Sequence, residues 1–288
     1  MADYIYPDIG RPGLANSLLP LGRAVVLSHR TGVPLLAPQW ARFRIGPYLR
    51  GERDKRDYWR FMRADPSDVR GLLRLAVLAA SKRTPETNAL DELARTGGLT
   101  SGGTVVVSGL GEYFIPLRGH GALLRASFTR RVTDDALTAA KPGQGTFIAA
   151  HVRRGDFTLN PSHVTPLEWF VDRIQAMRSV VGANTPVYVV SDGDRDDLAL
   201  LLALPGVERW TGRSAPDEML LLSDARVVIG SGSSTFSMLG AFLGDVPLIM
   251  PPRGNLQAGV YGDASMEAES ALGSALPESI VKTLGMKC

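Results

Sequence analysis

A run of polar residues follows a short apolar, β-rich segment in the middle of the chain. The segment is 146–150, and the run comprises His151, Val152, Arg153, Arg154, Gly155 and Asp156. Two adjacent arginines at a strand end are unfavourable near a core unless they meet an anion, and a guanidinium forms bidentate hydrogen bonds with phosphate. Gly155 would let the backbone turn close to such a ligand. A structural ion pair between Asp156 and either arginine explains the same residues equally well.

A loop rich in glycine and serine is the second candidate anion site. It spans residues 230–237 and includes Ser233, Ser234, Thr235 and Phe236. Because it precedes an expected helix, its backbone N–H groups, its hydroxyls and the helix dipole could all face a phosphate. No lysine follows in the P-loop pattern. Serine and threonine also favour N-cap positions, so an ordinary capped turn remains an alternative.

Two shorter motifs occupy similar places. Asp192 follows the apolar run 186–190, where it could hold a ribose or a base, or simply form a turn. Residues 10–16 form a glycine-rich turn that opens an expected helix and ends at Asn16. Close approach of a ligand fits this turn, although Asn16 would also be a good N-cap.

The elements that would position these residues alternate through the second half of the chain. Apolar runs predict strands at 146–150, 186–190, 207–210, 226–230 and 246–250, and helical periodicity predicts helices at 166–182, 194–204, 215–225 and 234–243. The strands are continuously apolar, as in a parallel sheet covered on both faces. We therefore expect a doubly wound α/β domain over about 144–265, with ligands beyond the carboxyl ends of its strands.

The first half is less regular. We expect helices at 16–31 and 67–82, strands at 33–37 and 104–107, and an irregular basic stretch at 40–66. In the helix at 67–82, the apolar residues expected to pack inward are Leu72, Leu73, Leu75, Ala76, Leu78 and Ala79. Residues 141–145 have linker composition, so the boundary is placed between 143 and 144.

Together these motifs resemble one family. Residues 151–156 match the H-x-R-R-x-D motif of GDP-fucose-dependent fucosyltransferases, most closely the bacterial α-1,2-fucosyltransferase type. Residues 13–16 resemble the G-x-G-N entrance of that family. Its later block is matched in order and spacing by Asp217-Glu218-Met219, Ser223-Asp224-Ala225, Val228-Ile229 and Ser233-Ser234-Thr235-Phe236-Ser237.

The resemblance implies a GT-B-like α/β fold of two facing Rossmann-type domains. Residues 1–143 would form the acceptor side, and residues 144–288 would bind the nucleotide sugar. The implied activity is inverting transfer of fucose from GDP-fucose to a glycan hydroxyl. It implies no metal ion and no cofactor apart from the donor substrate, so the expected partners are a nucleotide sugar and a glycan acceptor.

The same resemblance assigns roles to individual residues. Arg153 and Arg154 would hold the GDP phosphates, and Asp156 would order the motif. The residues expected to bind the donor are His151, Asn16, Asp192, Ser233, Ser234, Thr235 and Phe236. Candidates for a catalytic base, by proximity in the sequence, are Asp156, His163 and Glu168.

The chain departs from the family at three places. Met238-Leu239 replaces a usual Trp pair, Ala15 replaces a glycine, and Ser17 replaces a usual Gln. These changes could alter the sugar or the acceptor, so a transferase using another nucleotide sugar is an alternative. A second alternative is a non-catalytic protein that binds anions or polyphosphate.

Composition excludes several other classes. Hydrophobic residues make up 44% and charged residues 21% of the 288 residues, which is typical of a globular protein. The single cysteine, Cys288, rules out an internal disulfide and argues against a cysteine-based zinc site. No apolar run approaches the ~20 residues needed to span a bilayer, and no signal-peptide pattern opens the chain, so we expect a cytoplasmic protein.

The chain has a net charge of +3, and its arginine and lysine residues are densest at 42–63. This stretch could be a solvated surface, or it could attract an anionic substrate or place the protein at the periphery of a membrane. Aromatic residues interleave with its charges, but no nucleic-acid-binding signature accompanies them, so we expect no nucleic-acid partner. The sequence predicts no particular oligomeric state.

Overall fold

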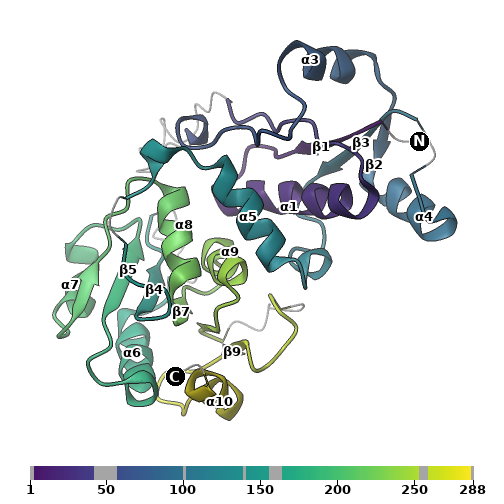
Figure 1. The fold of residues 1–288 in the computed structure, drawn as a ribbon. Helices are drawn as coiled ribbons and strands as arrows, with labels where there is room; N and C mark the ends of the chain where they lie inside the picture. Colours follow the sequence, from purple (N-terminus) through teal and green to yellow (C-terminus); the bar gives the residue numbers. More distant parts are fainter. Residues whose placement is uncertain are drawn as a thin grey trace. The chain divides into compact units, whose positions relative to one another are not determined.

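The computed structural model describes residues 3–41, 57–99, 102–138, 141–155, 164–252 and 259–286. These residues form two compact units, each built from helices and a parallel sheet (Figure 1). The expected α/β class is therefore confirmed. The first unit runs to Thr133 and the second begins at Asp134. The linker composition had placed the boundary after residue 143.

The second unit contains a six-stranded sheet in the order β6-β5-β4-β7-β8-β9, with parallel neighbours throughout. From the central strand β4 the chain adds β5 and β6 on one side, then returns to add β7, β8 and β9 on the other. This reversal is the topological switch point of a doubly wound fold. The strands are β4 (Ile148–Val152), β5 (Val187–Ser191), β6 (Val207–Arg209), β7 (Val227–Gly230), β8 (Leu248–Met250) and β9 (Glu267–Glu269).

Helices cover both faces of this sheet (Figure 1). Alternate residues of β4, namely Ile148, Ala150 and Val152, belong to a core that also contains residues of α6 and α10. The intervening His151 faces the opposite side, where it meets Ser237 of α9. The helices are α6 (Leu167–Val181), α7 (Ala199–Leu202), α8 (Ala215–Asp224), α9 (Thr235–Gly244) and α10 (Glu278–Met286), with a 3₁₀ turn η6 at Asp196–Leu198.

Close packing of α8 against α9 fixes the position of the glycine–serine loop. A Cβ on Gly240 would lie 2.6 Å from Cβ of Leu222, and one on Gly244 would lie 1.9 Å from the carbonyl oxygen of Ser223. Only glycine therefore allows this approach. The N-terminus of α8 is capped by Ser214, whose Oγ accepts the N–H of Asp217 at 3.2 Å.

The first unit contains a three-stranded parallel sheet in the order β1-β3-β2. Its core includes Ile5, Val105 and Val107 from the sheet, together with Ala24 and Leu27 from α1. The elements are β1 (Tyr4–Asp8), α1 (Leu14–Thr31), η1 (Tyr58–Arg60), α3 (Gly71–Ala80), β2 (Arg83–Pro85), α4 (Glu86–Thr96), β3 (Thr104–Ser108), η2 (Ile115–Leu117) and α5 (Gly121–Arg131), and the second unit then opens with η3 (Asp134–Ala136).

Three expectations for secondary structure were wrong. Residues 33–37 form no strand, because only Leu35 and Leu36 make isolated bridges, with Ile5 and Val69. The helix expected at 194–204 is a 3₁₀ turn followed by the four-residue α7. The helix expected at 67–82 is the shorter α3, and the leucines expected inside are exposed: Leu72 by 85%, Leu73 by 57% and Leu75 by 55%.

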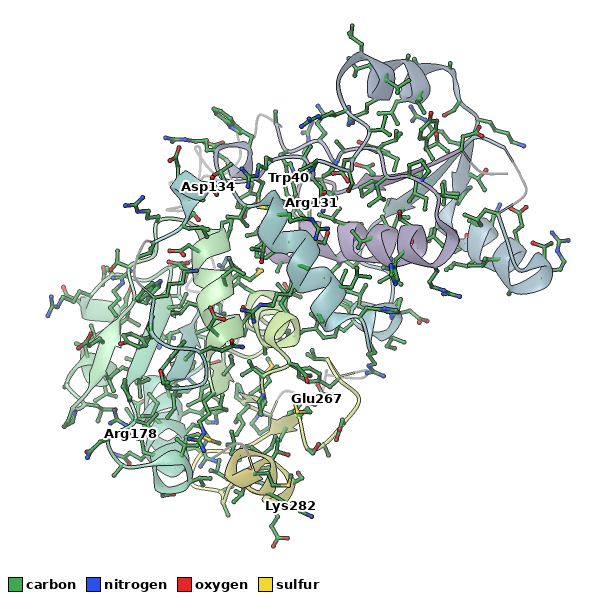
Figure 2. All side chains as sticks on the ribbon, viewed as in Figure 1. Trp40, Arg131, Asp134, Arg178, Glu267 and Lys282 are labelled. Carbon is green, nitrogen blue, oxygen red and sulfur yellow. The ribbon has the colours of Figure 1, made fainter. Side chains whose placement is uncertain are left out.

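The late start of α3 has a physical cause. Arg131, labelled in Figure 2 and only 1% exposed, lies 2.6 Å from Asp68 and 3.1 Å from Asp65. The other oxygen of Asp68 accepts the backbone N–H of Asp65 at 3.0 Å. These bonds hold 65–68 in a turn, so the helix begins only at the left-handed Gly71, at φ 66°.

Some expectations lie outside the described residues. These are Asp156, His163, Cys288 and the basic residues between 42 and 56, whereas Arg60 and Arg63 are described and exposed. No helix in the described part of the chain is long and apolar enough to cross a membrane.

Candidate functional site

The carboxyl ends of three adjacent strands bring the main candidate residues together in the second unit. β4 is flanked by β5 and β7, with Val152 opposite Ser191 and His151 opposite Gly230. The next residues in each strand direction are Arg153, Asp192 and Ser231, so all three emerge at the same edge of the sheet. This is the switch point, where open α/β sheets bind ligands.

Two serines, one at the end of each flanking strand, form hydrogen bonds with the backbone at the end of β4. Ser191 Oγ donates to the carbonyl of Val152 at 2.6 Å. Ser231 Oγ donates to the carbonyl of His151 at 2.9 Å and accepts the N–H of Arg153 at 2.8 Å. The backbone of Arg153 is therefore held in a fixed direction. Both serines belong to the motifs found in the sequence, but the sequence assigned neither of them this role.

Asp192 links the two arginines. Its Oδ2 lies 3.0 Å from Nη1 of Arg153, and its Oδ1 accepts the backbone N–H of Arg154 at 2.7 Å. A Cβ on Gly155 would lie 2.3 Å from Oδ2, and a Cβ on Gly193 would lie 2.9 Å from Cγ of Arg154. Glycine at both positions lets the two turns interlock, so Gly155 makes room for a carboxylate of the protein itself.

Arg209 supports the turn that carries Asp192. From the end of β6, its Nη2 donates to the carbonyl of Gly193 at 2.7 Å and to that of Ser191 at 3.3 Å. A guanidinium that binds the carbonyls on either side of Asp192 stiffens the loop. The sequence pattern gave no indication of this role.

The two adjacent arginines occupy different environments. The Arg153 side chain is 28% exposed at the sheet edge. Arg154 is buried, and its Nη1 donates to the carbonyl of Thr165 at 2.9 Å. Burial lowers the pKa of the Arg154 guanidinium, while nearby carboxylates, Asp197 foremost, act in the opposite direction. Arg154 thus connects β4 to the segment before α6.

His151 is part of the framework around the site. Its ring is stacked on Phe236 at a centroid distance of 5.0 Å, and its Nδ1 lies 2.8 Å from Ser237 Oγ. Burial, reinforced by the charge of Arg153, lowers the pKa of His151 from 6.5 to about 3. The imidazole is therefore neutral at ordinary pH and orients β4 against α9.

The glycine–serine loop leads into α9 at the same edge. Ser233 is exposed and left-handed at φ 59°. Ser234 is the N-cap residue, but no described side chain caps the helix, since its Oγ instead lies 3.4 Å from Nδ1 of His151. Thr235 and Phe236 stand in the first turn, where backbone N–H groups lack intrahelical partners. Such a turn is suited to an anion.

Asn16 belongs to the first unit. It stands in the first turn of α1, whose N-cap residue is Gly13, so the N-cap role considered for Asn16 is wrong. Its Oδ1 is shielded from solvent and has no hydrogen-bond partner among the described residues. A buried acceptor of this kind is unfavourable until a donor satisfies it.

Two further residues named from the sequence, Glu168 and Asp217, lie in different environments. Glu168 lies exposed in the first turn of α6. Asp217 is fully buried, where Lys141 lies 2.9 Å from its Oδ1 and Thr138 donates to its Oδ2 at 2.5 Å. These bonds join the chain entering the second unit to α8. In the described ranges, no three His, Cys, Asp or Glu residues cluster as metal ligands would.

Comparison by sequence found no matching family model and no matching curated protein. Comparison of structures found similar folds. NodZ alpha-1,6-fucosyltransferase soaked with GDP-fucose is 18% identical over 88% of this chain and 97% of its own, with a TM-score of 0.54. Fucosyltransferase NodZ from Bradyrhizobium is 18% identical over 86% and 94%, with a TM-score of 0.53.

A mutant of Arabidopsis thaliana FUT1 in complex with GDP is 15% identical over 88% of this chain and 71% of its own, with a TM-score of 0.52. At identities this low, the likeness shows a shared fold. It confirms the expected GT-B-like α/β class.

Proposed function

We propose that this chain is an inverting, metal-independent glycosyltransferase that transfers fucose from GDP-fucose to a glycan hydroxyl. The proposal rests mainly on one observation: Arg153, Asp192 and the first turn of α9 lie together at the switch point of the second unit. The fold shared with fucosyltransferases, among them NodZ soaked with GDP-fucose, supports the choice of donor. The sequence motif favours the α-1,2 type, and linkage is part of the proposal.

Charge development at the leaving group gives the site its chemistry. As the bond between the sugar and the β-phosphate breaks, negative charge grows on GDP. Arg153 and the N–H groups of the first turn of α9 are preorganised donors that stabilise this charge, and they supply what a divalent cation would otherwise supply. Ser233, Ser234 and Thr235 add hydroxyls beside the diphosphate.

Arg153 and Arg154 divide the work between them. Arg153 meets the phosphates, because it is the partly exposed member of the pair. Arg154 is a positioning residue that anchors the strand end through Thr165. Asp192 is also a positioning residue, because its carboxylate orients the Arg153 guanidinium at the sheet edge.

Inversion follows from direct attack by the acceptor. The glycan oxygen forms the new bond to the anomeric carbon on the face opposite GDP, the bond to the β-phosphate oxygen breaks, and the hydroxyl proton passes to a base or to solvent. Glu168 is the candidate base among described residues, and Asp156 and His163 are candidates outside them. The first unit provides the acceptor side, and Asn16 remains a proposed ligand of the donor.

Thermal melting with nucleotides tests the proposal. The protein is melted with GDP, UDP, ADP and dTDP at matched salt, with and without EDTA. A ligand at 100 times its Kd stabilises the folded state by about 2.7 kcal/mol, so selectivity is easily resolved. A GDP-selective rise that survives EDTA supports the proposal, and turnover of GDP-fucose with a panel of glycans follows.

The other outcomes of the melting experiment would assign a different function to the site. A rise with UDP in place of GDP identifies a transferase that uses a different nucleotide sugar. Equal rises with every nucleotide, abolished by salt and without turnover, identify a non-catalytic anion-binding protein.

A further inference from the structure

Helix α3 (Gly71–Ala80) presents an apolar surface that no described residue covers. None of its residues is buried, and Leu72, Leu73 and Leu75 are 85%, 57% and 55% exposed. The helix stands apart from the sheet of its own unit (Figure 1). A helix that is apolar on nearly all sides normally lies in a core or a membrane. This surface therefore calls for a partner.

The single charged residue of α3 does not oppose an apolar partner. Arg74 is half-buried, its Nε donates to the carbonyl of Ala37 at 2.6 Å, and its guanidinium carbon lies 5.4 Å from the centroid of the Tyr6 ring. Its charge is thus directed into the protein and ties the helix to the unit. The outward surface carries only leucine, alanine and valine side chains.

Cations bracket this apolar surface. Arg70 precedes the helix and Lys82 and Arg83 follow it, and all three are exposed. Across residues 66–85 the only acidic residue is Asp68, which is 5% exposed and paired with Arg131. A patch of exposed leucines between exposed cations matches the interface of an anionic bilayer, where acyl chains lie beneath phosphates.

We propose that α3 docks this protein onto an anionic lipid bilayer, with its leucines among the acyl chains and its flanking cations at the lipid phosphates. Ten residues of helix measure about 15 Å, half the ~30 Å of a hydrocarbon core, so the helix lies in the interface and does not span it. The proposal is independent of the nucleotide-sugar site. It also differs from membrane contact through 42–63, since α3 lies outside that stretch.

The charges that flank α3 favour a bilayer over a second copy of the chain as the partner of this surface. A twofold contact through α3 would place the same surface on both partners. Arg70, Lys82 and Arg83 of one copy would then approach their counterparts on the other, and residues 66–85 contribute no exposed acid to neutralise them. An anionic surface instead attracts all three, by about fivefold in affinity for each cation near the headgroups.

Vesicle flotation of the full chain tests the proposal. Vesicles are made of phosphatidylcholine alone or of phosphatidylcholine and phosphatidylglycerol in equimolar amounts. The protein should float with the anionic vesicles and less with the neutral ones. The triple variant Leu72→Ser/Leu73→Ser/Leu75→Ser should lose at least about 30-fold in partitioning, since three exposed leucines no longer enter the apolar layer.

The chain offers a matched control. Leu90, Leu200 and Leu272 are also exposed, by 40%, 44% and 59%, and lie outside α3. The triple serine variant at these positions should float like the unaltered protein. The double variant Arg70→Gln/Lys82→Gln tests the cations without touching the leucines, and should lose about 25-fold on anionic vesicles.

Three results would overturn the proposal. One is an unaltered protein that stays unbound to anionic vesicles, and another is an α3 variant that floats as well as the control. The third is a dimer, seen by light scattering, that the α3 variant converts to a monomer without any flotation, which would assign the surface to a second copy. Circular dichroism verifies folding, and if the serine variant unfolds, the double glutamine variant decides.

Discussion

The carboxylate of Asp192 lies 3.0 Å from Nη1 of Arg153, and this pair joins the ends of two neighbouring strands. It is only partly exposed, at 19% for the Asp192 side chain and 28% for that of Arg153, so solvent screens it incompletely. The same carboxylate receives the backbone N–H of Arg154. Asp192 thus fixes the direction of the Arg153 side chain at the sheet edge.

Arg153→Ala tests that arginine directly. Removal of one preorganised donor to a developing charge typically lowers the rate by about 10²–10³-fold, so transfer from GDP-fucose should nearly vanish. The melting temperature should change little, because the side chain is partly exposed. Steady-state kinetics and thermal melting measure the two effects. Normal turnover would refute the role, and unfolding would favour a structural ion pair.

Arg154→Ala is the matched comparison, because it removes the same side chain one residue later. This arginine is buried and satisfies the carbonyl of Thr165, so its loss should destabilise the fold by about 1–3 kcal/mol. Urea unfolding gives this value, and GDP binding by the folded fraction should persist. A stable variant that has lost GDP would show that Arg154, too, is a phosphate ligand.

Asp192→Asn separates positioning from nucleotide contact. The amide oxygen can still accept the N–H of Arg154, but the charge that orients Arg153 is gone. We expect kcat to fall about tenfold while GDP binds no more weakly, since a competitor for the guanidinium has been removed. Titration with GDP measures the change in affinity, and steady-state kinetics with GDP-fucose measure the change in kcat. A large loss of GDP affinity would instead place Asp192 on the ribose or base.

Gly155→Ala should act through Asp192. The added Cβ would lie 2.3 Å from Oδ2 of that residue, so the carboxylate must leave its position beside Arg153 and the N–H of Arg154, or the turn must move. We expect a destabilisation of about 1–3 kcal/mol, together with reduced transfer. In an Asp192→Ala background the same substitution should be nearly neutral. A double-mutant cycle by urea unfolding measures the coupling, and additive effects would contradict this cause.

The strands of the second unit could be predicted because each is a continuous apolar run. The runs at 186–190 and 226–230 became β5 and β7, and their ends carry Asp192 and Ser231. The sequence also contained a signal that Arg154 would be more buried than Arg153. Val152 faces the core shared with α6, and Arg154, two residues on, continues toward that side.

The first unit gave weaker signals for physical reasons. β1 contains Pro7, which argues against a strand, yet β1 pairs with β3 on one side and makes only a bridge from Ile5 to Leu35 on the other. A missing N–H is tolerated there. The leucines of α3 show why periodicity alone cannot tell a core face from an unpartnered one, since both have the same pattern. The roles of the site residues remain predictions.

The buried His151 makes the free energy of unfolding depend on pH. Its pKa is about 3 in the folded protein and 6.5 when unperturbed, because burial disfavours the imidazolium. Between these values the unfolded chain binds a proton that the folded chain rejects. Its contribution to stability is therefore complete above 6.5, and is lost as the pH falls toward 3 at up to about 1.4 kcal/mol per pH unit.

His151→Gln isolates this effect, because glutamine can still reach the Ser237 hydroxyl but does not titrate. Urea unfolding of both proteins across this range should show a difference in unfolding free energy that shrinks as the solution becomes more acidic. The unaltered protein should be the more stable one at neutral pH, where its imidazole also keeps the stacking on Phe236. A difference that stays constant with pH would mean that His151 takes up a proton as readily in the folded as in the unfolded protein, and would make it a candidate ligand for the phosphates again.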